Sequence, residues 1–549
     1  MSYTNKEVAS LFRELGKIME IHGESPFKTR AYENAYRTIR SMTEPVAEKT
    51  SVELQSIPGI GKAIADKTVE LMETGKISAL EKYREKTPPG VVDMLQIKGL
   101  GPKKIKQIWT TLGIESVGEL LYACNENRLV TLDGVGLKTQ KDILAKSKYY
   151  LQSRDKMHYA KVLSVAQEVL KKMTEQVGDG KVMIVGDVRR QMPVIAGMSF
   201  MGSDDGSKFK SIFENWTVSN EGESYQGTFE GIQSTYVQVR EDEWGRRAIE
   251  LSSDAEFLTL LMDKYGELPD GGQEEEVFNA LGCPYILPAR RESRLWGYPE
   301  LMTETQEVTM ADVKGVIHAH STYSDGGATL AEMAEACRAK GYTYLGITDH
   351  SKAAFYANGL EESRVKLQWS EIDELNEQFT DFRIFKGIEA DILSDGSIDY
   401  GDEFLEGFDF VIASVHSVLN MDEERATARL IAAIEHPAMT LLGHPTGRLL
   451  LSREGYPIQH KKVIDAASAN GVAIEINANP YRLDLDWKWI PYALEKGVPL
   501  SINPDAHSIA GIDDIQWGIP VAIKGGAKTE NLLCCKSADD FAEYISRKK

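Results

Sequence analysis

The chain has few cysteines and no long hydrophobic run. Its cysteines are odd in number and form no CxxC pair of the zinc-site kind, so free thiols in a reducing compartment are expected at Cys124, Cys283, Cys337, Cys534 and Cys535. The sequence has no run of eighteen apolar residues that could cross a membrane, and MSYTNKEVASLFREL at its start lacks the apolar core of a signal peptide. These absences predict a cytoplasmic protein without a membrane partner.

Positive charges are outnumbered by negative ones, and the two are unevenly distributed along the chain. The net charge is −20 over 549 residues, yet residues 1–150 carry 23 Lys and Arg against 19 Asp and Glu, and the remainder carries 40 against 64. A mildly basic front end on an acidic body fits a protein that contacts phosphates at one end. The length exceeds what one hydrophobic core supports, so several domains are expected.

Three similar segments occur in residues 57–147: IPGIGKAIADKTVEL from Ile57, IKGLGPKKIKQIWTTL from Ile97 and LDGVGLKTQKDILAKS from Leu132. Each has a glycine pair, a following lysine and a helical pattern, and the spacing predicts repeated helix–turn–helix units. Unpaired amides at the helix starts, with the lysines, form a phosphate site that ignores base identity. One copy is more simply a helix cap. Three copies predict backbone-directed DNA binding through Gly59, Gly61, Lys62, Gly99, Gly101, Lys103, Lys104, Gly134, Gly136 and Lys138.

The region from 151 to 300 mixes helical patterns with strands. The apolar run VMIV leads through Gly-Asp to Arg189 and Arg190, a suitable arrangement for contacting a triphosphate. Chemistry on a nucleotide would also need closely spaced carboxylates to hold magnesium, but the next strand supplies Gly197 and Ser199 instead. Whether this stretch is an active site depends on the rest of the chain.

Seven apolar runs alternate with helical patterns after residue 315. The runs are KGVIHAH, YTYLGITDH, FRIFKGIEAD, FDFVIASVH, MTLLGHP, GVAIEINAN and VPLSINPDAH. Seven β-then-α units predict a parallel sheet, most simply a barrel of the (β/α) kind. The polar, non-periodic residues 301–315 before it are predicted to be a linker.

Metal-ligand side chains stand at the ends of these runs. Eight of the ten histidines lie after residue 315, and six of them, with three carboxylates, give nine candidate ligands: His318, His320, Asp325, His350, Glu389, His416, His444, Asp505 and His507. The carboxyl ends of barrel strands converge on one mouth, where active sites lie. The pairs His318/His320 and Asp505/His507 are two apart, so each pair is expected to face one side of its strand. Nitrogen and oxygen ligands without thiolate predict two to three divalent ions, Zn, Mn or Fe.

A lone HxH is more often incidental than a metal site, but ligand types at the ends of six of the seven predicted strands favour metal binding. His436 and His460 are predicted to be ordinary packing or surface residues. Several metals in one polar mouth favour phosphoester hydrolysis, because the ions activate water and neutralise charge on phosphate. Lys352 and Arg448 are candidates for holding the phosphate, although basic residues beside strand ends are also commonly solvated.

The motifs HAHSTYSDG, TDHS, GIEADI, SVHS, GHPTGR, EINANPYRLDLDW and PDAH resemble those of the PHP (polymerase and histidinol phosphatase) domain, and all nine candidate ligands match. EEEVFNALGCPYILPARRE resembles the thumb end of bacterial family X DNA polymerases, and ESPFKTRAYENAYRTI resembles their N-terminal helical domain. The resemblance implies a multidomain α/β protein. Its parts would be an all-α helix-hairpin-helix domain (1–150), an α+β nucleotidyltransferase-like palm and thumb (151–300), a linker (301–315) and a distorted (β/α)7 barrel PHP domain (316–549).

The resemblance also implies that the palm has lost its catalytic carboxylates. In the family, the first strand–turn carries Gly-Ser followed by Arg, and the next strand carries Asp-x-Asp. Here Asp187 replaces the serine, Gly197 and Ser199 fall on the two aspartates, and Thr235 falls on the third carboxylate. Two-metal nucleotidyl transfer is therefore not expected. The adjacent Asp204 and Asp205 would point to opposite faces of a strand and are more simply a surface turn.

Taken together, the resemblance implies a metal-dependent phosphoesterase acting on DNA without sequence preference, as a 3′-5′ exonuclease or in 3′-end or abasic-site processing during repair. A monomer is expected. The alternatives are a working gap-filling polymerase with an unusual palm, and a DNA-binding scaffold whose PHP domain is structural. Lys67 stands where family members that remove 5′-deoxyribose phosphate keep a Schiff-base lysine; a solvated lysine is the simpler interpretation.

Overall fold

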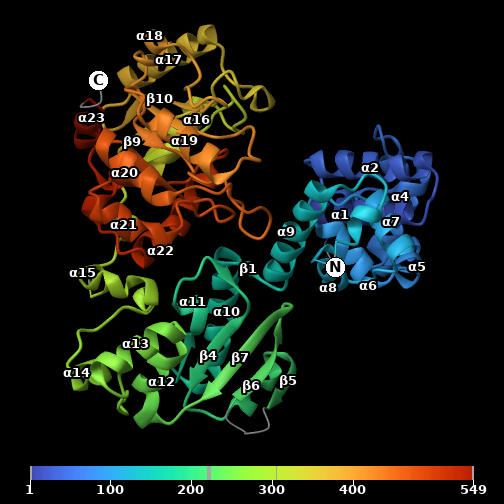
Figure 1. The fold of residues 1–549 in the computed structure, drawn as a ribbon, viewed down its shortest axis with the longest axis horizontal. Coiled ribbons are helices and arrows are strands. Elements are labelled where there is room, and N and C mark those ends of the chain that lie inside the picture. Colours follow the sequence, from blue (N-terminus) through green and yellow to red (C-terminus); the bar gives the residue numbers. More distant parts are fainter. Residues whose placement is uncertain (1–2, 126, 219–223, 304–305, 547–549) are drawn as a thin grey trace. The chain divides into compact units, whose positions relative to one another are not determined.

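The computed structural model describes residues 3–125, 127–218, 224–303 and 306–546. The chain divides into two compact units, residues 1–154 and 155–549 (Figure 1). All five cysteines are free, as expected. Among the described residues, no helix is long and apolar enough to cross a membrane.

The first unit is all helical. Its α-helices are α1 (Asn5–Ile21), α2 (Pro26–Ser41), α3 (Ser51–Gln55), α4 (Lys62–Thr74), α5 (Ser78–Glu85), α6 (Pro89–Asp93), α7 (Pro102–Leu112), α8 (Val117–Asn125) and α9 (Leu137–Ser153). Apolar residues at helical spacing, such as Val8, Phe12 and Leu15 of α1, are fully buried in a single core that continues into α7 and α9. The predicted helix–turn–helix repeats end in α4, α7 and α9.

The second unit begins with a palm-like sheet. Its strands are β2 (Val182–Val185), β4 (Met198–Gly202), β5 (Glu214–Val218), β6 (Ser224–Phe229) and β7 (Ile232–Gln238), in the order β2-β4-β7-β6-β5. The helix α10 (Tyr159–Val177) buries Val162, Ala166 and Val169 in a core shared with this sheet. A short pair, β1 (Met157–His158) with β3 (Val194–Ile195), lies beside them. The short helix α11 (Gly186–Arg189) follows β2, and the thumb-like part contains α12 (Trp244–Leu251), α13 (Ala255–Tyr265), α14 (Glu274–Ala280) and α15 (Pro299–Met302).

The predicted seven-stranded barrel is confirmed. Its parallel strands are β8 (Gly315–Ala319), β9 (Tyr344–Ile347), β10 (Arg383–Asp391), β11 (Phe410–Ser414), β12 (Leu441–Leu442), β13 (Ala473–Asn477) and β14 (Leu500–Asn503), paired in chain order. A bridge between Ala319 and Ala506 joins the first strand to the last and nearly closes the barrel. The helices α16 (Leu330–Ala339), α17 (Glu362–Gln378), α18 (Asp402–Leu405), α19 (Glu423–Ile434), α20 (His460–Asn470), α21 (Ile490–Glu495), α22 (Ile515–Lys524) and α23 (Ala538–Ser546) complete this part.

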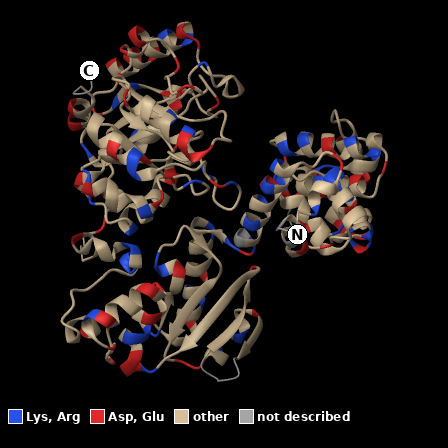
Figure 2. Ribbon diagram, viewed as in Figure 1, with Lys and Arg blue, Asp and Glu red and all other residues tan. Residues whose placement is uncertain are grey.

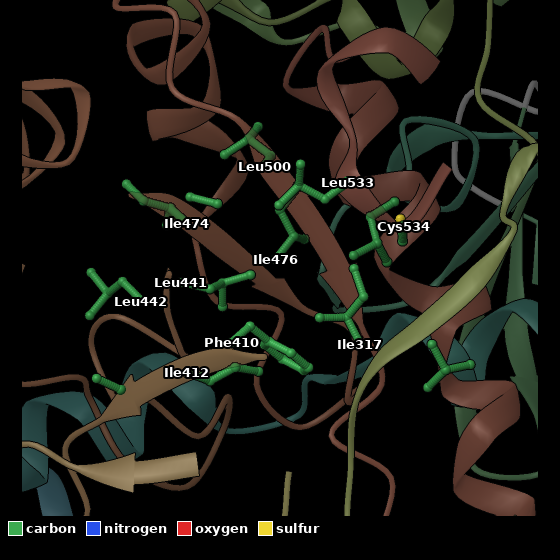
Figure 3. Packing of buried hydrophobic residues seen from close by; sticks show 14 of the residues in the cluster. Ile317, Phe410, Ile412, Leu441, Leu442, Ile474, Ile476, Leu500, Leu533 and Cys534 are labelled. Atoms are coloured by element: carbon green, nitrogen blue, oxygen red, sulfur yellow. The ribbon is translucent and has the colours of Figure 1, made fainter. Parts of the chain in front are cut away.

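The strands of the barrel carry different chemistry on their two faces. Successive side chains of a strand point to opposite faces, so β13 presents Ile474 and Ile476 on one face and Glu475 and Asn477 on the other. The isoleucines belong to the same buried apolar cluster as residues of the neighbouring strands and Leu533 (Figure 3). The polar residues Glu475 and Asn477 are also fully buried, and they lie beside the candidate ligands.

The segment before the barrel is more than a linker. Residues 301–315 contain the end of α15, a short 3-10 turn at Met310–Asp312 and the start of β8. Val308 and Val313 are buried in the barrel core, which the polar composition of the segment did not predict. The palm side also contacts the barrel directly: Arg290, fully buried, donates from Nε to the carbonyl oxygen of Ile523 at 3.0 Å.

Candidate metal centre

All nine candidate ligands lie together at the carboxyl ends of the barrel strands. His318 and Glu389 lie within β8 and β10, and the others follow a strand closely, except Asp325, which lies in the loop after β8. Seven of the nine side chains are at most 10% exposed, whereas Asp325 and His507 are 35% and 41% exposed. The cluster is therefore buried on most sides, and its accessible side is at Asp325 and His507.

Glu389 is the centre of the arrangement. Its Oε1 lies 3.1 Å from His444 Nε2, 3.2 Å from His416 Nε2 and 3.5 Å from His318 Nε2. Its Oε2 lies 3.0 Å from His350 Nδ1 and 3.6 Å from His320 Nε2. One carboxylate on β10 thus contacts five histidines, which come from β8, β9, β11 and β12 or from the residues that directly follow these strands.

Three groups in the cluster have ligand atoms within 4.8 Å of one another. They are His320 with Asp325, His350 and His507; His318 with His320 and Asp505; and His350 with Glu389 and His416. His320 and His350 each belong to two groups, so the three groups adjoin one another and form one continuous cluster. His444 joins the cluster through its contact with Glu389.

One expectation about side-chain direction is wrong. Asp505 and His507 do not share a strand face, because β14 ends at Asn503 and Asp505 turns the chain with φ +52°. Asp505 contributes to the group with His318, and His507 contributes to the group with Asp325. This turn lets two residues that are close in sequence reach two different positions.

Buried residues behind the cluster orient the ligands. His318 Nδ1 lies 2.7 Å from Glu475 Oε2, and His416 Nδ1 lies 2.6 Å from Asp391 Oδ1. Glu475 also accepts from the side chains of Asn477 and Asn503. A carboxylate on the second ring nitrogen fixes the tautomer and leaves the first nitrogen for a metal. The sequence analysis missed these residues, although Asp391 and Glu475 stand two positions from Glu389 and Asn477 in motifs it quoted.

The donor set fits divalent cations. Within the described part of the chain, Nε2 of His318, Nδ1 of His320 and Oε2 of Glu389 are buried and make no hydrogen bond, which is costly unless another partner takes them. Although burial opposes protonation, Glu389 and Asp391 raise the pKa of His416 to about 10. Burial and the neighbouring His350 and His507 lower the pKa of His320 to about 3. The carboxylates attract positive charge, and metal ions can supply it in place of protons.

Both candidate phosphate residues make contacts within the protein, and their role in holding a phosphate stays a prediction. Arg448 donates to the carbonyl oxygens of Arg482 and Leu483 and to Asp486, so its guanidinium is engaged. Lys352 lies over the ring of Tyr400 at 5.1 Å. The guanidinium of Arg482 instead reaches the cluster, with Nε 3.7 Å from Asp505 Oδ2. The motif EINANPYRLDLDW contains Arg482, but the sequence does not indicate where a long side chain in a loop points.

The three glycine hairpins of the helical unit share one geometry. The first glycine of each pair, Gly59, Gly99 and Gly134, has φ of +92°, +85° and +74°. The second is the N-cap of α4, α7 or α9, and none of these helices has a side-chain cap. A Cβ at the second glycine would meet nothing within 4 Å. Lys and Arg are also frequent along α2 and α9 (Figure 2). These helix starts present uncapped amides in open positions, as a phosphate backbone requires.

The comparisons with known proteins match these parts. Residues 3–77 match the family described as helix-hairpin-helix domain, residues 91–148 the SAM-like helix-hairpin-helix tandem, and residues 317–479 the PHP domain. The chain is 33% identical to the DNA polymerase/3'-5' exonuclease PolX of Bacillus subtilis (strain 168), over 99% of both chains. The chain belongs to the PolX family. A "probable phosphatase" of Thermoanaerobacter sp. (strain X514) is 30% identical over 42% of this chain and 94% of its own length, and one of Caldicellulosiruptor saccharolyticus is 33% identical over the same shares.

The palm of this PolX chain has neutral residues where the resemblance puts carboxylates. Ser199 of β4 pairs with Thr235 of β7 on one side and with Val185 of β2 on the other. The positions of Ser199 and Thr235 are therefore neighbours in the sheet. Gly197 precedes β4, and a Cβ built on it would lie 2.8 Å from the backbone oxygen of Gln233. Asp204 is bound to Lys208, and Asp205 accepts from Ser207 N and Tyr225 Oη, as expected of a turn.

The two arginines after β2 are bound by acids of the PolX thumb. Arg189 donates to both oxygens of Glu274, at 2.9 and 2.6 Å. Arg190 donates to both oxygens of Glu292, at 2.8 and 2.9 Å, and to Asp187 at 3.2 Å. Burial opposes ionisation of Glu274, but Arg291 and Arg189 hold its pKa at about 2. The arginines therefore hold the palm to the thumb. Both guanidinium groups are paired with carboxylates, so neither is free to contact a triphosphate as the sequence suggested.

Lys67 of the PolX helical unit lies on α4. Its Nζ donates to the carbonyl oxygen of Ala63 one turn earlier, at 3.4 Å. This is the ordinary contact of a solvent-facing lysine on a helix, and a lyase role for Lys67 stays a prediction.

Proposed function

We propose that this chain is a metal-dependent phosphodiesterase that removes nucleotides from the 3′ end of DNA, including 3′-end or abasic-site processing in repair. The observation that carries the proposal is the convergence of nine nitrogen and oxygen ligands around Glu389. Two to three ions, Zn, Mn or Fe, would be held by these residues. When bound, such ions activate water and neutralise charge on a phosphate. The PolX relative, named as a polymerase and 3'-5' exonuclease, supports the polarity.

The surroundings of the cluster support a nucleic-acid substrate. Phe355 and Tyr356, in the loop after β9, are 85% and 60% exposed, and the Tyr356 ring lies 6.5 Å from that of His350. Exposed aromatic rings beside a catalytic cluster give unpaired bases a surface on which to stack. Arg482 adds a cation beside Asp505 that can attract the negative charge of a phosphate. The helical unit would hold the duplex, and the palm would serve as a scaffold.

A nuclease assay with metal removal tests the proposal. Purified protein supplied with manganese should shorten a 5′-labelled primer on its template from the 3′ end, in single-nucleotide steps. Chelation with EDTA should stop the reaction by removing the ions. Adding back one of the three metals should restore it, because the ligand residues remain in the protein. Elemental analysis of the purified protein identifies the metal. If the primer stays full length when Zn, Mn and Fe are supplied one after another, the proposed activity is contradicted.

The hairpins give a second expected result. The double variant Gly99→Val with Lys103→Glu should weaken DNA binding by a similar factor for all sequences, because valine is strained at φ +85° and a phosphate contact is lost. Binding of the wild type should also weaken as salt rises, because phosphate contacts release counterions. Fluorescence anisotropy with duplexes of unrelated sequence measures both effects.

Lys82→Glu, on α5 and outside the hairpins, is the matched control for the change of charge. It should leave affinity nearly unchanged. A loss confined to one sequence, or binding indifferent to salt, would count against backbone recognition by the hairpins.

A further inference from the structure

A cavity lies next to the metal cluster and is not explained by metal binding. It has a volume of about 420 Å³, within the range of small-ligand sites. Two loops form it: residues 449–452, after β12, and residues 479–482, after β13. Both loops follow barrel strands at their carboxyl ends, the edge that carries the metal ligands.

Contacts connect the cavity to the metal cluster. Arg482 lines the cavity, and its Nε lies 3.7 Å from Oδ2 of the ligand Asp505. Asn479, also in the lining, donates its backbone N–H to Asn477 Oδ1, and Asn477 donates from Nδ2 to Asp505 at 3.1 Å. A small molecule bound in the cavity would therefore place one end at Arg482, beside the metal-ligand residues.

The lining combines an aromatic ring with apolar side chains. Tyr481 is 54% exposed although its ring borders the cavity. Leu449, Leu450 and Leu451 supply the apolar part of the lining. An exposed aromatic ring over apolar side chains, with a cation at one end, matches a nucleotide: a flat base at one end and a phosphate at the other.

The palm contributes the remaining wall. His158, from β1, donates from Nε2 to the carbonyl oxygen of Leu450 at 3.1 Å, and its ring lies 4.6 Å from that of Tyr481, edge to face. The backbone N–H of Leu450 in turn donates to the carbonyl oxygen of Tyr481 at 2.6 Å. His158 thus holds both loops. The phosphatase relatives share only 42% of this chain over nearly their whole length, so a wall supplied by the palm belongs to the larger protein.

We infer that this cavity holds the base of the 3′-terminal nucleotide, stacked on Tyr481, with the adjoining phosphodiester directed past Arg482 to the metal ligands. His158 is a positioning residue that keeps Tyr481 and the residue 449–452 loop in place. The inference rests on the proposed function, because it names how that same centre selects its substrate. It also gives the palm a role that does not need its missing carboxylates: completing the nuclease site.

The test compares two primers that differ only at the terminus. One ends in a normal nucleotide, and the other ends in a tetrahydrofuran abasic unit. The wild-type protein with manganese should cleave the normal terminus about 5- to 150-fold more efficiently in kcat/KM, the range that stacking of one base supplies. Tyr481→Ala should lower the rate on the normal terminus to about the rate on the abasic one, so that the preference between the two primers is lost. Tyr481→Phe should keep the preference, and His158→Ala should reduce it in part.

An unchanged preference in Tyr481→Ala, or an equal loss on both primers, would overturn the inference while leaving the nuclease proposal standing. A wild type that cleaves neither primer would overturn the nuclease proposal. Calorimetry then tests separately whether the cavity binds a nucleotide. Deoxyadenosine monophosphate should bind the wild type more tightly than deoxyribose 5-phosphate does, and Tyr481→Ala should remove the difference. Equal binding of the two probes to the wild type would show that the cavity does not take a base.

Discussion

Replacing His318 or Asp505 by alanine will abolish cleavage of DNA and leave DNA binding nearly intact. His318 contacts both Glu389 and Asp505, and the two residues belong to one group of candidate ligands. Changes to residues that only orient metal ligands typically cost 10- to 100-fold, so loss of a ligand should exceed about 100-fold. Binding should persist because the hairpins lie in the other unit. The shortening of a labelled primer and the anisotropy of the same primer measure the two properties.

Two further variants separate metal binding from general damage. Glu475→Gln keeps the shape of a fully buried side chain but weakens its contact with His318 Nδ1, so it should lose about 10- to 100-fold in rate. His436→Ala removes a histidine that pairs with Asp402 outside the cluster, and it should cleave as the wild type does. Undiminished cleavage in both His318→Ala and Asp505→Ala would refute the metal assignment.

The sequence predicted the barrel and its cluster because both depend on local patterns. Buried parallel strands are apolar along their whole length, so each of the seven runs was visible by itself. Strand ends of a parallel barrel meet at one mouth whatever the details of packing. The position of Glu389 at the centre was not predictable, because it depends on how the four strands β8, β9, β11 and β12 are placed around it.

Contacts between distant segments were not visible in the sequence. Arg189 and Glu274 are 85 positions apart, and Arg190 and Glu292 are 102 apart. Nothing in the local pattern distinguishes an arginine awaiting a phosphate from one paired inside the protein. The same limit applies to Arg448 and Arg482: Arg448 is held by Asp486 and by two carbonyl oxygens of a neighbouring loop, whereas Arg482 lies beside Asp505.

The second large effect expected is an absence of polymerase activity: the protein will not extend a primer with magnesium and deoxynucleotides. The transition state gathers negative charge and needs ions held between the attacking oxygen and the triphosphate. Ser199 and Thr235, directly opposite each other on β4 and β7, offer only neutral oxygens. Asp187 adds negative charge near the turn after β2, and Arg189 and Arg190 are already paired with Glu274 and Glu292. Incorporation of a labelled nucleotide into a gapped duplex measures the activity.

Restoring the acids will not restore synthesis. The triple variant Gly197→Asp, Ser199→Asp and Thr235→Asp should stay inactive unless Asp187→Ser is added, because Asp187 repels the triphosphate. The structure adds a steric obstacle, since a Cβ at position 197 lies 2.8 Å from a backbone oxygen that cannot move without shifting β7. The quadruple variant should therefore regain at most weak extension. Template-directed extension by the unmodified protein, lost in Asp204→Asn or Asp205→Asn, would show that those turn residues hold the metals and that the palm is active.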